Sequence, residues 1–235
     1  MNVVSIMAHQ DDEMRCLGTL LKCRARGDRL FFVTLTDGSK GFVQNPAITR
    51  AAAAQIRDAE MRALAGAVEA EYYNLGELDE FLYDTPDVRL RLLDVIRRTG
   101  ADLIFTHFDQ DYNTDHTVTH SLVRQCAMHA GLPVLATEAA PLARHPAIFL
   151  VEPHGPFVFP ATHYVDISDY HAEKVALLLR HESQEVALQL AAGSGLEAMA
   201  RRLDGYRGEQ VGCAYAECFT PMRARGALKP YGVLP

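Results

Sequence analysis

The chain has 235 residues, of which 49% are hydrophobic and 23% charged, so its composition is that of an ordinary globular protein and not of a disordered or fibrous one. Its 23 Lys and Arg against 30 Asp and Glu give a net charge of −7, which argues against nucleic acid or an anionic membrane as the main partner. A small anionic ligand held by a local arginine remains compatible with this charge.

Five cysteines without a CxxC pair, and no apolar run near the roughly 18 residues of a membrane span, favour a reducing compartment. We therefore expect a cytoplasmic protein with neither nucleic acid nor a membrane as its partner. A homo-oligomer is compatible with the sequence.

Apolar runs alternate with helical patterns along the first 130 residues. Four buried strands are predicted, at residues 2–7, 30–36, 71–75 and 103–108. Helices are predicted between and after them, at about residues 17–27, 49–65, 85–100 and 116–129. Strands alternating with helices at this pitch indicate βαβ units and a parallel sheet that is covered on both faces.

Residues 133–160 interrupt this pattern and carry six of the eleven prolines, so we interpret them as a proline-rich excursion near the site. Further strands are predicted at residues 147–151 and 163–167, followed by a helix over 169–190 and a less regular tail. The expected fold is α/β, a Rossmann-like, mostly parallel sheet sandwiched between helices. One domain over residues 1–235 accommodates the whole pattern.

Two clusters of polar side chains follow predicted strands. The first strand ends in AHQDDE, residues 8–13, without the glycine-rich turn that cradles phosphates. The fourth strand is followed by a second cluster, His107, Asp109, Asp111, Tyr112, Asn113, Asp115, His116 and His120. Both clusters could converge at the carboxyl ends of parallel strands, where open α/β sheets bind ligands. Imidazole and carboxylate together suit zinc, whereas one or two acids alone would simply favour a helix start.

The residues AHQDDE resemble the AHPDDE signature of the LmbE/PIG-L family of zinc-dependent N-deacetylases, and NTDH at 113–116 resembles that family's HPDH motif. Further similar positions are Thr36-Asp37-Gly38, Arg57, Glu60, Leu75-Gly76, Asp79, Lys174, residues 181–184 and residues 216–219. The resemblance implies a Rossmann-like fold. It also implies hydrolysis of acetyl or related acyl groups from amino sugars and their conjugates.

Carried over by position, the resemblance makes His9, Asp12 and His116 the ligands of one Zn²⁺ ion per chain, with another divalent transition metal as an alternative. Asp11 then becomes the general base. Zinc would lower the pKa of its bound water and polarise the amide carbonyl. The Asp11 carboxylate would take the proton of that water and pass it to the leaving amine.

The second motif departs from the family at a position that bears on catalysis. Asn113 stands where the family has a histidine, and a neutral amide can donate a hydrogen bond to an oxyanion but cannot deliver a proton. Either Asp11 performs both proton transfers or another histidine substitutes. The candidate substitutes are His154, His163 and His120. Asp115 keeps its place, so the predicted catalytic residues are Asp11, Asn113 and Asp115.

Three residues are predicted to bind the substrate. Arg57 could donate to a hydroxyl or a phosphate, and Asp79 could accept from two adjacent sugar hydroxyls. Tyr112 could line the pocket or simply pack. Against these roles, Arg57 could be a solvated helix residue and Asp79 a loop acid.

The leading hypothesis from the sequence is a zinc-dependent hydrolase that removes an N-acetyl group from a small-molecule amino sugar or amino-sugar conjugate. One alternative is an amidase that acts on a thiol-sugar conjugate or another acyl amide. A second alternative, motivated by Asn113, is a zinc-binding but catalytically inactive binding module.

Overall fold

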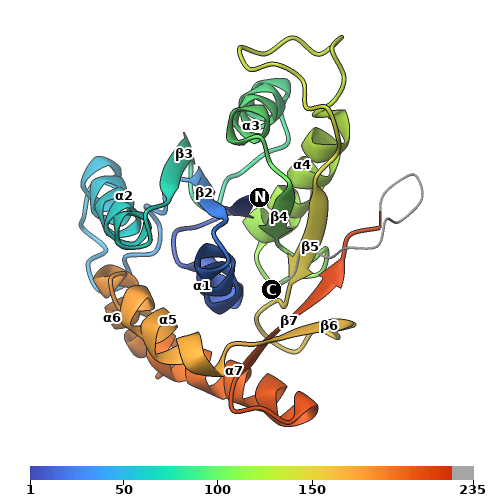
Figure 1. Cartoon of the computed structure of the whole chain (residues 1–235). Coiled ribbons are helices and arrows are strands. Elements are labelled where there is room, and N and C mark those ends of the chain that lie inside the picture. Colours follow the sequence, from blue (N-terminus) through green and yellow to red (C-terminus); the bar gives the residue numbers. More distant parts are fainter. Residues whose placement is uncertain (224–235) are drawn as a thin grey trace.

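The computed structural model describes residues 1–223, in which seven strands form one sheet in the order β3-β2-β1-β4-β5-β7-β6 (Figure 1). The strands are β1 (Asn2–Met7), β2 (Arg29–Thr36), β3 (Glu71–Glu77), β4 (Leu103–Thr106), β5 (Ala147–Val151), β6 (His163–Asp166) and β7 (Ala216–Pro221). Strands β1 to β5 pair in parallel, whereas β7 is antiparallel to β5 and to β6. The predicted α/β fold with a mostly parallel sheet is confirmed.

Helices cover both faces of this sheet. They are α1 (Leu17–Ala25), α2 (Arg50–Ala67), α3 (Pro86–Thr99), α4 (Thr114–His129), α5 (His171–Leu178), α6 (Glu182–Ala192) and α7 (Leu196–Val211), with 3₁₀ turns η1 (Asp12–Arg15) and η2 (Ser168–Tyr170). Helices α3 and α4 pack on one face, and α1, α2, α5 and α7 pack on the other (Figure 1). None of the helices within residues 1–223 is long and apolar enough to cross a membrane.

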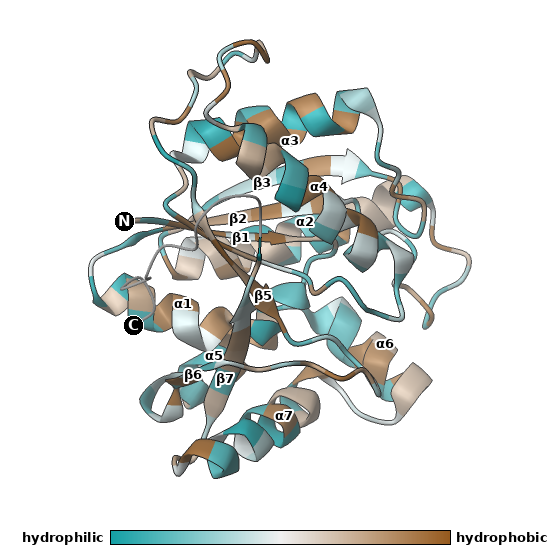
Figure 2. Cartoon of the chain, turned by 90° about the vertical axis from the view of Figure 1, so that its right-hand side faces the viewer, coloured by the Kyte–Doolittle hydropathy of each residue, from teal (hydrophilic) through white to brown (hydrophobic). Residues whose placement is uncertain are grey.

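The central strands bury side chains on both faces, which explains why they read as continuous apolar runs. Val3 and Phe32 pack into the core beneath α1 and α2, while their neighbours Val4 and Phe31 pack beneath α3 and α4. A strand covered on both sides has no polar face, so period-two alternation is absent. Figure 2 shows the same arrangement, with hydrophobic strands at the centre and hydrophilic residues on the outer sides of the helices.

The ends of α2 and α3 lie at capping residues that can be recognised in the sequence. The side chains of Thr49 and Thr85 accept hydrogen bonds from backbone N–H groups three residues ahead, at the starts of α2 and α3. Helix α3 ends at Gly100 in the left-handed conformation, at φ 60°, as predicted.

The C-terminal third differs from the sequence prediction. The helix expected over 169–190 is two helices, α5 and α6, separated by a turn at His181, whose buried ring bonds to Glu13. The tail expected to be less regular contains α7 and the buried strand β7. Glycines weaken the helical pattern of α7 in the sequence. Gly208 is nevertheless needed, because a Cβ there would lie 2.7 Å from the carbonyl oxygen of Cys213. The last residues of the predicted single domain, 224–235, lie outside the described residues.

The segment predicted as one proline-rich excursion has three parts. Residues up to 146 lie beside α3, where the Arg97 guanidinium donates to the carbonyl oxygens of Ala130, Leu132 and Leu135. Strand β5 is a buried strand of the sheet. The residues after β5 reach the functional site, since His154, Gly155 and Pro156 line its cavity.

The order of the strands places a topological switch point between β1 and β4. From β1 the chain proceeds outward through β2 and β3 on one side, and later through β4 and β5 on the other. Open α/β sheets bind ligands in the crevice at the carboxyl ends of such a pair. Both polar clusters follow these two strands, so the predicted convergence of the clusters is confirmed.

Candidate metal centre and active site

Three side-chain groups from the two clusters face one another at the carboxyl ends of β1 and β4. His9 Nδ1 lies 3.2 Å from His116 Nε2, and each of these nitrogens lies 3.3 Å from an oxygen of Asp12. Tetrahedral zinc with bonds of roughly 2.0–2.1 Å holds its ligand atoms about 3.3 Å apart. The three groups therefore have the spacing of one face of a tetrahedral metal site, and these residues can hold a metal ion.

Carboxylates hold the outer nitrogens of both histidines. His9 Nε2 lies 3.0 Å from Asp79 Oδ1 and 3.4 Å from Asp115 Oδ2, and His116 Nδ1 lies 3.0 Å from Asp111 Oδ2. A carboxylate beside the outer nitrogen favours a proton there, which leaves the facing nitrogen with its lone pair, as metal ligation requires.

The charge at this centre favours a cation. Burial lowers the pKa of His116, but Asp12 and Asp111 outweigh it and raise this pKa to about 9. The pKa of Asp12 is held well below its usual range, since His116 and His107 offset the burial that would raise it. A cluster that stabilises a proton on imidazole in this way also stabilises a metal ion.

His107 lies beside the centre, with its Nε2 3.4 Å from Asp12 Oδ2, and with Asp111 and His116 it forms a second group that could hold a metal ion. Its Nε2 accepts a hydrogen bond from the Ala8 N–H at 3.0 Å, and its ring stacks on that of His116 with centroids 4.0 Å apart. Burial, with a smaller contribution from His116, lowers the pKa of His107 to about 4. A neutral ring whose acceptor nitrogen is already used supports the His116 ligand and does not replace it.

Asp11, the predicted general base, lines the cavity next to Asp12 and is fixed at both its backbone and its carboxylate. Its backbone has φ 123°, a conformation that non-glycine residues rarely adopt. The Asp11 N–H donates to Glu13 Oε2 at 3.0 Å, and Glu13 Oε1 lies 2.7 Å from the Nε2 of the buried His181. Arg57 Nη2 donates to Asp11 Oδ1 at 2.8 Å. Burial raises the pKa of Asp11 more than Arg57 lowers it, which suits a proton acceptor.

Gln10, which stands where the family has proline, is fully buried and ties two loops together. Its Nε2 donates to the Thr36 carbonyl oxygen at 3.2 Å. The backbone of Gly38 lies against the side chains of Gln10 and Arg57, because a Cβ there would lie 2.2 Å from Gln10 Oε1 and 2.8 Å from Arg57 Nε. The φ of Gly38 is 65°. The glycine of the Thr36-Asp37-Gly38 segment is therefore required to form this wall of the cavity.

The structure brings the three predicted substrate-binding residues to the same cavity. Arg57 is 2% exposed, and its Nε and Nη1 are buried without a hydrogen-bond partner among the described residues. Asp79 contacts His9 and accepts from the Lys40 N–H at 2.7 Å. Tyr112 is exposed, with its ring edge near His116. Their roles in binding stay predictions, and for Asp79 the geometry also supports orienting His9.

Asn113 and Asp115 shape the loop that closes the cavity. Asn113 caps α4, since its Oδ1 accepts from the Asp115 N–H at 2.7 Å, while its Nδ2 donates to Glu80 Oε1 at 3.2 Å. Both oxygens of Asp115 accept backbone N–H groups, from Glu80 at 2.8 Å and from Leu82 at 3.0 Å. Asp115 thereby holds the loop after β3 against His9.

Of the three histidines proposed to replace the missing acid, His154 lies at the cavity. His120 bonds to the His107 carbonyl oxygen, and His163 in β6 packs on Phe149 in β5. His154 Nδ1 meets Arg15 Nη2, and because a guanidinium group can only donate, the proton of this imidazole is on Nε2. Burial, followed by Arg15, lowers the pKa of His154 to about 3, so the ring is a neutral hydrogen-bond donor.

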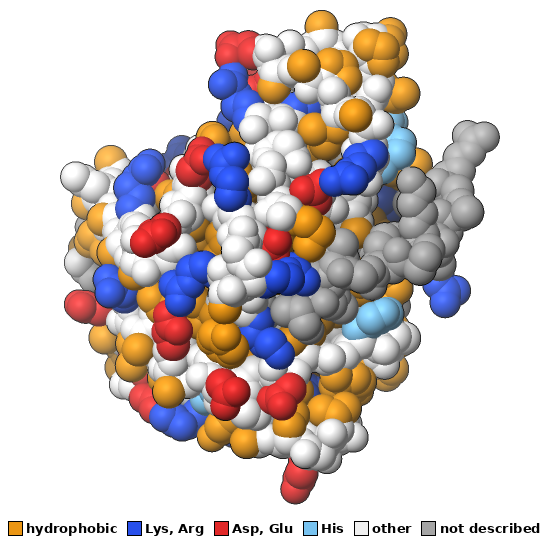
Figure 3. All heavy atoms as spheres, in the orientation of Figure 1, with side chains coloured by type: hydrophobic (Ala, Val, Ile, Leu, Met, Phe, Trp, Pro, Cys, Tyr) orange, Lys and Arg blue, Asp and Glu red, His pale blue; other side chains and the backbone are white. Residues whose placement is uncertain are grey.

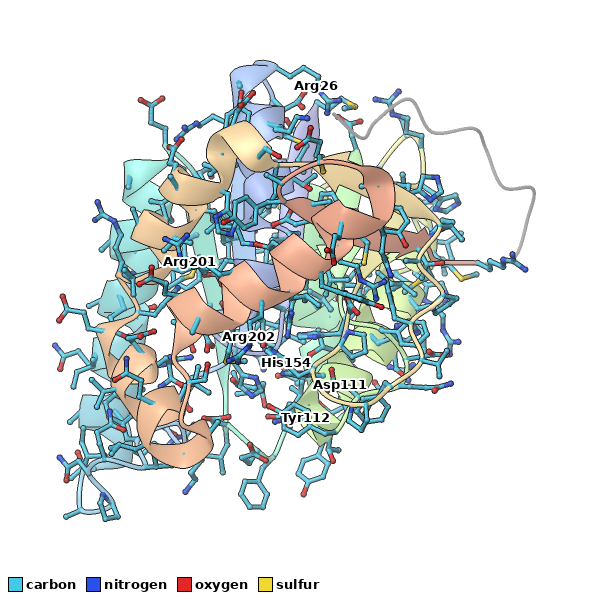
Figure 4. All side chains as sticks on the ribbon, turned by 90° about the horizontal axis from the view of Figure 1, so that it is seen from below. Arg26, Asp111, Tyr112, His154, Arg201 and Arg202 are labelled. Atoms are coloured by element: carbon cyan, nitrogen blue, oxygen red, sulfur yellow. The ribbon has the colours of Figure 1, made fainter. Side chains whose placement is uncertain are left out.

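The cavity that these residues line measures about 530 Å³, which fits a small molecule of sugar size. Figure 4 labels two of the residues that line it, Tyr112 and His154, with Asp111 beside them in that view. The sequence did not single out Arg15, and it gave Glu13 no role of its own within the AHQDDE motif, because their partners, His154 and His181, lie more than a hundred residues away.

Residues 4–127 match the family PIG-L, described as GlcNAc-PI de-N-acetylase, and this match spans more than half of the chain. The chain therefore belongs to the PIG-L family of de-N-acetylases, as the sequence motifs predicted. A comparison with curated proteins finds no match.

Solved structures share the fold over nearly the whole chain. The conserved protein TT1542 from Thermus thermophilus is 26% identical, with a TM-score of 0.80 over 97% of both chains. N,N'-diacetylchitobiose deacetylase from Pyrococcus horikoshii is 24% identical, with a TM-score of 0.81 over 94% of this chain and 83% of that one. GalB, the 4-carboxy-2-hydroxymuconate hydratase from Pseudomonas putida, is 21% identical, with a TM-score of 0.80 over 98% and 100%. Since the fold is found in a hydratase as well as a deacetylase, the reaction must be argued from the site.

Proposed function

We propose that the protein is a zinc-dependent hydrolase that removes an N-acetyl or related acyl group from a small-molecule amino sugar or amino-sugar conjugate. The observation that carries this proposal is the position of Asp11. Its carboxylate lines the same cavity as His9, Asp12 and His116. Because it pairs with Arg57 and is not one of the three candidate metal ligands, it could transfer protons beside a bound metal ion.

The donor set supports zinc, with one ion per chain. Two imidazoles and one carboxylate with tetrahedral spacing leave one position open for a water molecule or the substrate. An ion bound there lowers the pKa of a water molecule and polarises a carbonyl oxygen. Asp11 would accept the proton of the water molecule, and its raised pKa allows it to return that proton to the leaving amine.

His154 is the group we propose for the position that Asn113 leaves without a histidine. His154 lines the cavity, and its Nε2–H could donate a hydrogen bond to the oxyanion of the tetrahedral intermediate. Its pKa of about 3 means that it cannot serve as the proton donor near neutral pH, so both proton transfers fall to Asp11. Arg57, with two unpartnered N–H-bearing atoms, is the proposed contact for sugar hydroxyls.

The test is release of acetate from N-acetylglucosamine and its conjugates, measured with zinc and with a chelator. Asp11→Asn should retain stoichiometric zinc and lose on the order of 10²- to 10⁴-fold in kcat, the usual contribution of a general base. The matched control is Asp109→Asn, an exposed carboxylate in the loop after β4, which should keep the wild-type rate. Asp12→Ala and His116→Ala should lose both zinc and activity.

The alternatives have distinct outcomes in the same assay. Hydrolysis of other acyl amides with no acetylated sugar turned over would support the amidase and refute the sugar substrate. Zinc binding without turnover of any amide would support the inactive binding module, the alternative that Asn113 motivates. An Asp11→Asn variant as fast as the wild type would remove Asp11 from the mechanism.

A further inference from the structure

A second hollow adjoins the metal cavity and has not been given a role. It measures about 310 Å³, and Gly155 and Met199 line both it and the metal cavity. Its remaining wall includes two arginines, Arg15 at the end of η1 and Arg202 on α7. A ligand at the metal centre could therefore extend into it without leaving the protein surface.

Arg15 is partly buried and has no carboxylate partner among residues 1–223. Its Nη2 contacts His154, and its Nε is buried without a hydrogen-bond partner. Glu152 lines the same hollow, but both of its oxygens are bound by Arg207. Burial lowers the pKa of Arg15 more than the nearby carboxylates, Glu152 foremost, raise it. None of these carboxylates pairs with its guanidinium group, so an anion that does so would be bound favourably.

Arg202 is also free of carboxylates in the described part of the chain. It is exposed and donates to Ser194 Oγ at 2.8 Å, whereas its neighbour Arg201 pairs with Glu197 at 3.0 Å. Arg202 lines the hollow together with Gly155, the residue after His154, whereas Arg201 is not among its lining residues; Figure 4 labels both arginines and His154.

Most other arginines of this acidic protein are paired. Those that form an ion pair with a carboxylate are Arg24, Arg26, Arg29, Arg50, Arg57, Arg62, Arg89, Arg91, Arg98, Arg144, Arg201 and Arg207. On the face shown in Figure 3, blue and red side chains are likewise interspersed. Arg97, Arg124, Arg180 and Arg223 also have no ion pair among the described residues, but Arg15 and Arg202 are two unpaired arginines that line the same hollow.

We propose that this hollow binds an anionic group of the substrate, a carboxylate or a phosphate, through Arg15 and Arg202. The inference rests on the proposed function and narrows its substrate class to acylated amino compounds that carry a negative charge near the scissile amide. Guanidinium groups suit this purpose, since their planar N–H pairs match carboxylate and phosphate oxygens. Arg15 also contacts His154, so the anion and the proposed oxyanion donor are positioned by the same side chain.

The test is a binding measurement that does not depend on turnover. Zinc-loaded Asp11→Asn protein is titrated by calorimetry with neutral N-acetylglucosamine, with its 1- and 6-phosphates, and with N-acetylmuramic acid, which carries a carboxylate. At least one charged ligand should bind about 10- to 100-fold more tightly than the neutral sugar, the range expected for a hydrogen-bonded charge. Tighter binding of the phosphates alone or of the carboxylate alone identifies which anion is used.

Substituting the arginines tests whether the preference for charged over neutral ligands arises in this hollow. Arg15→Gln and Arg202→Gln, each in the Asp11→Asn background, should reduce the preference, and Arg15→Lys should keep part of it. Arg201→Gln removes the same charge one residue away on α7 and should retain the full preference. If Arg15→Gln does not fold, as judged by circular dichroism and zinc content, Arg202→Gln on the exposed side of α7 provides the test.

The outcomes separate this inference from the proposed function. Equal affinity for neutral and charged ligands, or a preference that survives both arginine substitutions, would overturn the anion site. If the wild-type protein released no acetate yet bound charged ligands through Arg15, the proposed function would fail and the anion site would stand. Turnover of neutral and charged sugars alike, with equal Kd values, would support the proposed function and refute the anion site.

Discussion

Asn113 has two hydrogen-bonding roles, and a histidine at this position could not fill both of them as well. Its Oδ1 caps α4, the helix that carries the His116 ligand, and its Nδ2 holds Glu80 at the edge of the cavity. Asparagine is among the best helix N-caps, and His154, which lines the cavity, is the group proposed as the hydrogen-bond donor there. The departure from the family motif is thus consistent with a site rebuilt around Asn113.

Removing the cap should therefore destabilise the protein. We expect Asn113→Ala and Asn113→His to lower the free energy of unfolding by about 1 kcal/mol, the typical value of an N-cap. Asn113→Ser, which retains an acceptor oxygen, should lose less. Urea denaturation of the zinc-loaded proteins measures these differences. We also expect no increase in kcat for Asn113→His, and a clear increase would mean that the wild-type site is damaged.

The two motifs that contain the candidate metal ligands could be predicted from the sequence because their residues are close together in the chain and match a known signature. The structure places His9, Asp12 and His116 within one ligand set, and it brings Asp11 and Arg57 together. The roles of side chains such as Arg15 could not be predicted, since they depend on partners that only the folded sheet brings near. An arginine three residues after a metal ligand gives no signal in the sequence that its charge is unpaired.

At the scale of elements, α6 holds the loop that follows β1. His181 begins α6 and is fully buried against Glu13, which in turn accepts from the Asp11 N–H. The strained backbone of Asp11, at φ 123°, thus depends on a contact across 168 residues. His181 is a positioning residue in this arrangement, because it acts on Asp11 through Glu13.

A double-mutant cycle should detect this connection. We expect Glu13→Ala and His181→Ala to show a coupling energy of about 1–3 kcal/mol in unfolding experiments, as residues in direct contact do. Each variant should lower kcat more than it raises KM, since Asp11 is misplaced while the substrate contacts remain. Glu13→Gln keeps an acceptor for the Asp11 N–H and should restore part of kcat. Additive effects in the cycle, together with unchanged kcat, would contradict the connection.

The sequence predicted helices and strands correctly where the local pattern and the tertiary contacts favour the same structure. It failed where the tertiary contacts override the local pattern. The cap and stop residues of α3 define its ends in the sequence as well as in the structure. Strand β7 was missed because it contains Glu217, a charge that looks out of place in a buried strand. In the structure Glu217 accepts from Lys174 at 2.8 Å and from the N–H groups of Gly18 and Thr19. A buried charge can be recognised as paired only once its partners are known.

At the scale of the whole molecule, a bound ion would join the two halves of the sheet. His9 and Asp12 follow β1, and His116 lies on α4 after β4, so an ion held by all three favours the folded state. At a zinc concentration about 1,000 times its Kd, this contributes roughly 4 kcal/mol. For a chain of this length, chelation should therefore lower Tm by about 8–16 °C. Calorimetric melts with zinc and with chelator measure the shift, and an equal shift in His116→Ala would mean that the ion binds elsewhere.

The metal-free protein should lose stability as the pH falls below about 6.5. The pKa values of His154 and His107 lie at about 3 and about 4 in the folded protein, both depressed first of all by burial. Between these values and the ordinary histidine pKa of about 6.5, the unfolded state binds more protons, so unfolding becomes easier as the pH falls. Each histidine contributes at most about 1.4 kcal/mol per pH unit. Urea denaturation from pH 4.5 to 6 should show a smaller slope for His154→Gln than for the wild type, with a constant difference above pH 7. Equal slopes would mean that His154 is protonated as readily in the folded protein as in the unfolded one.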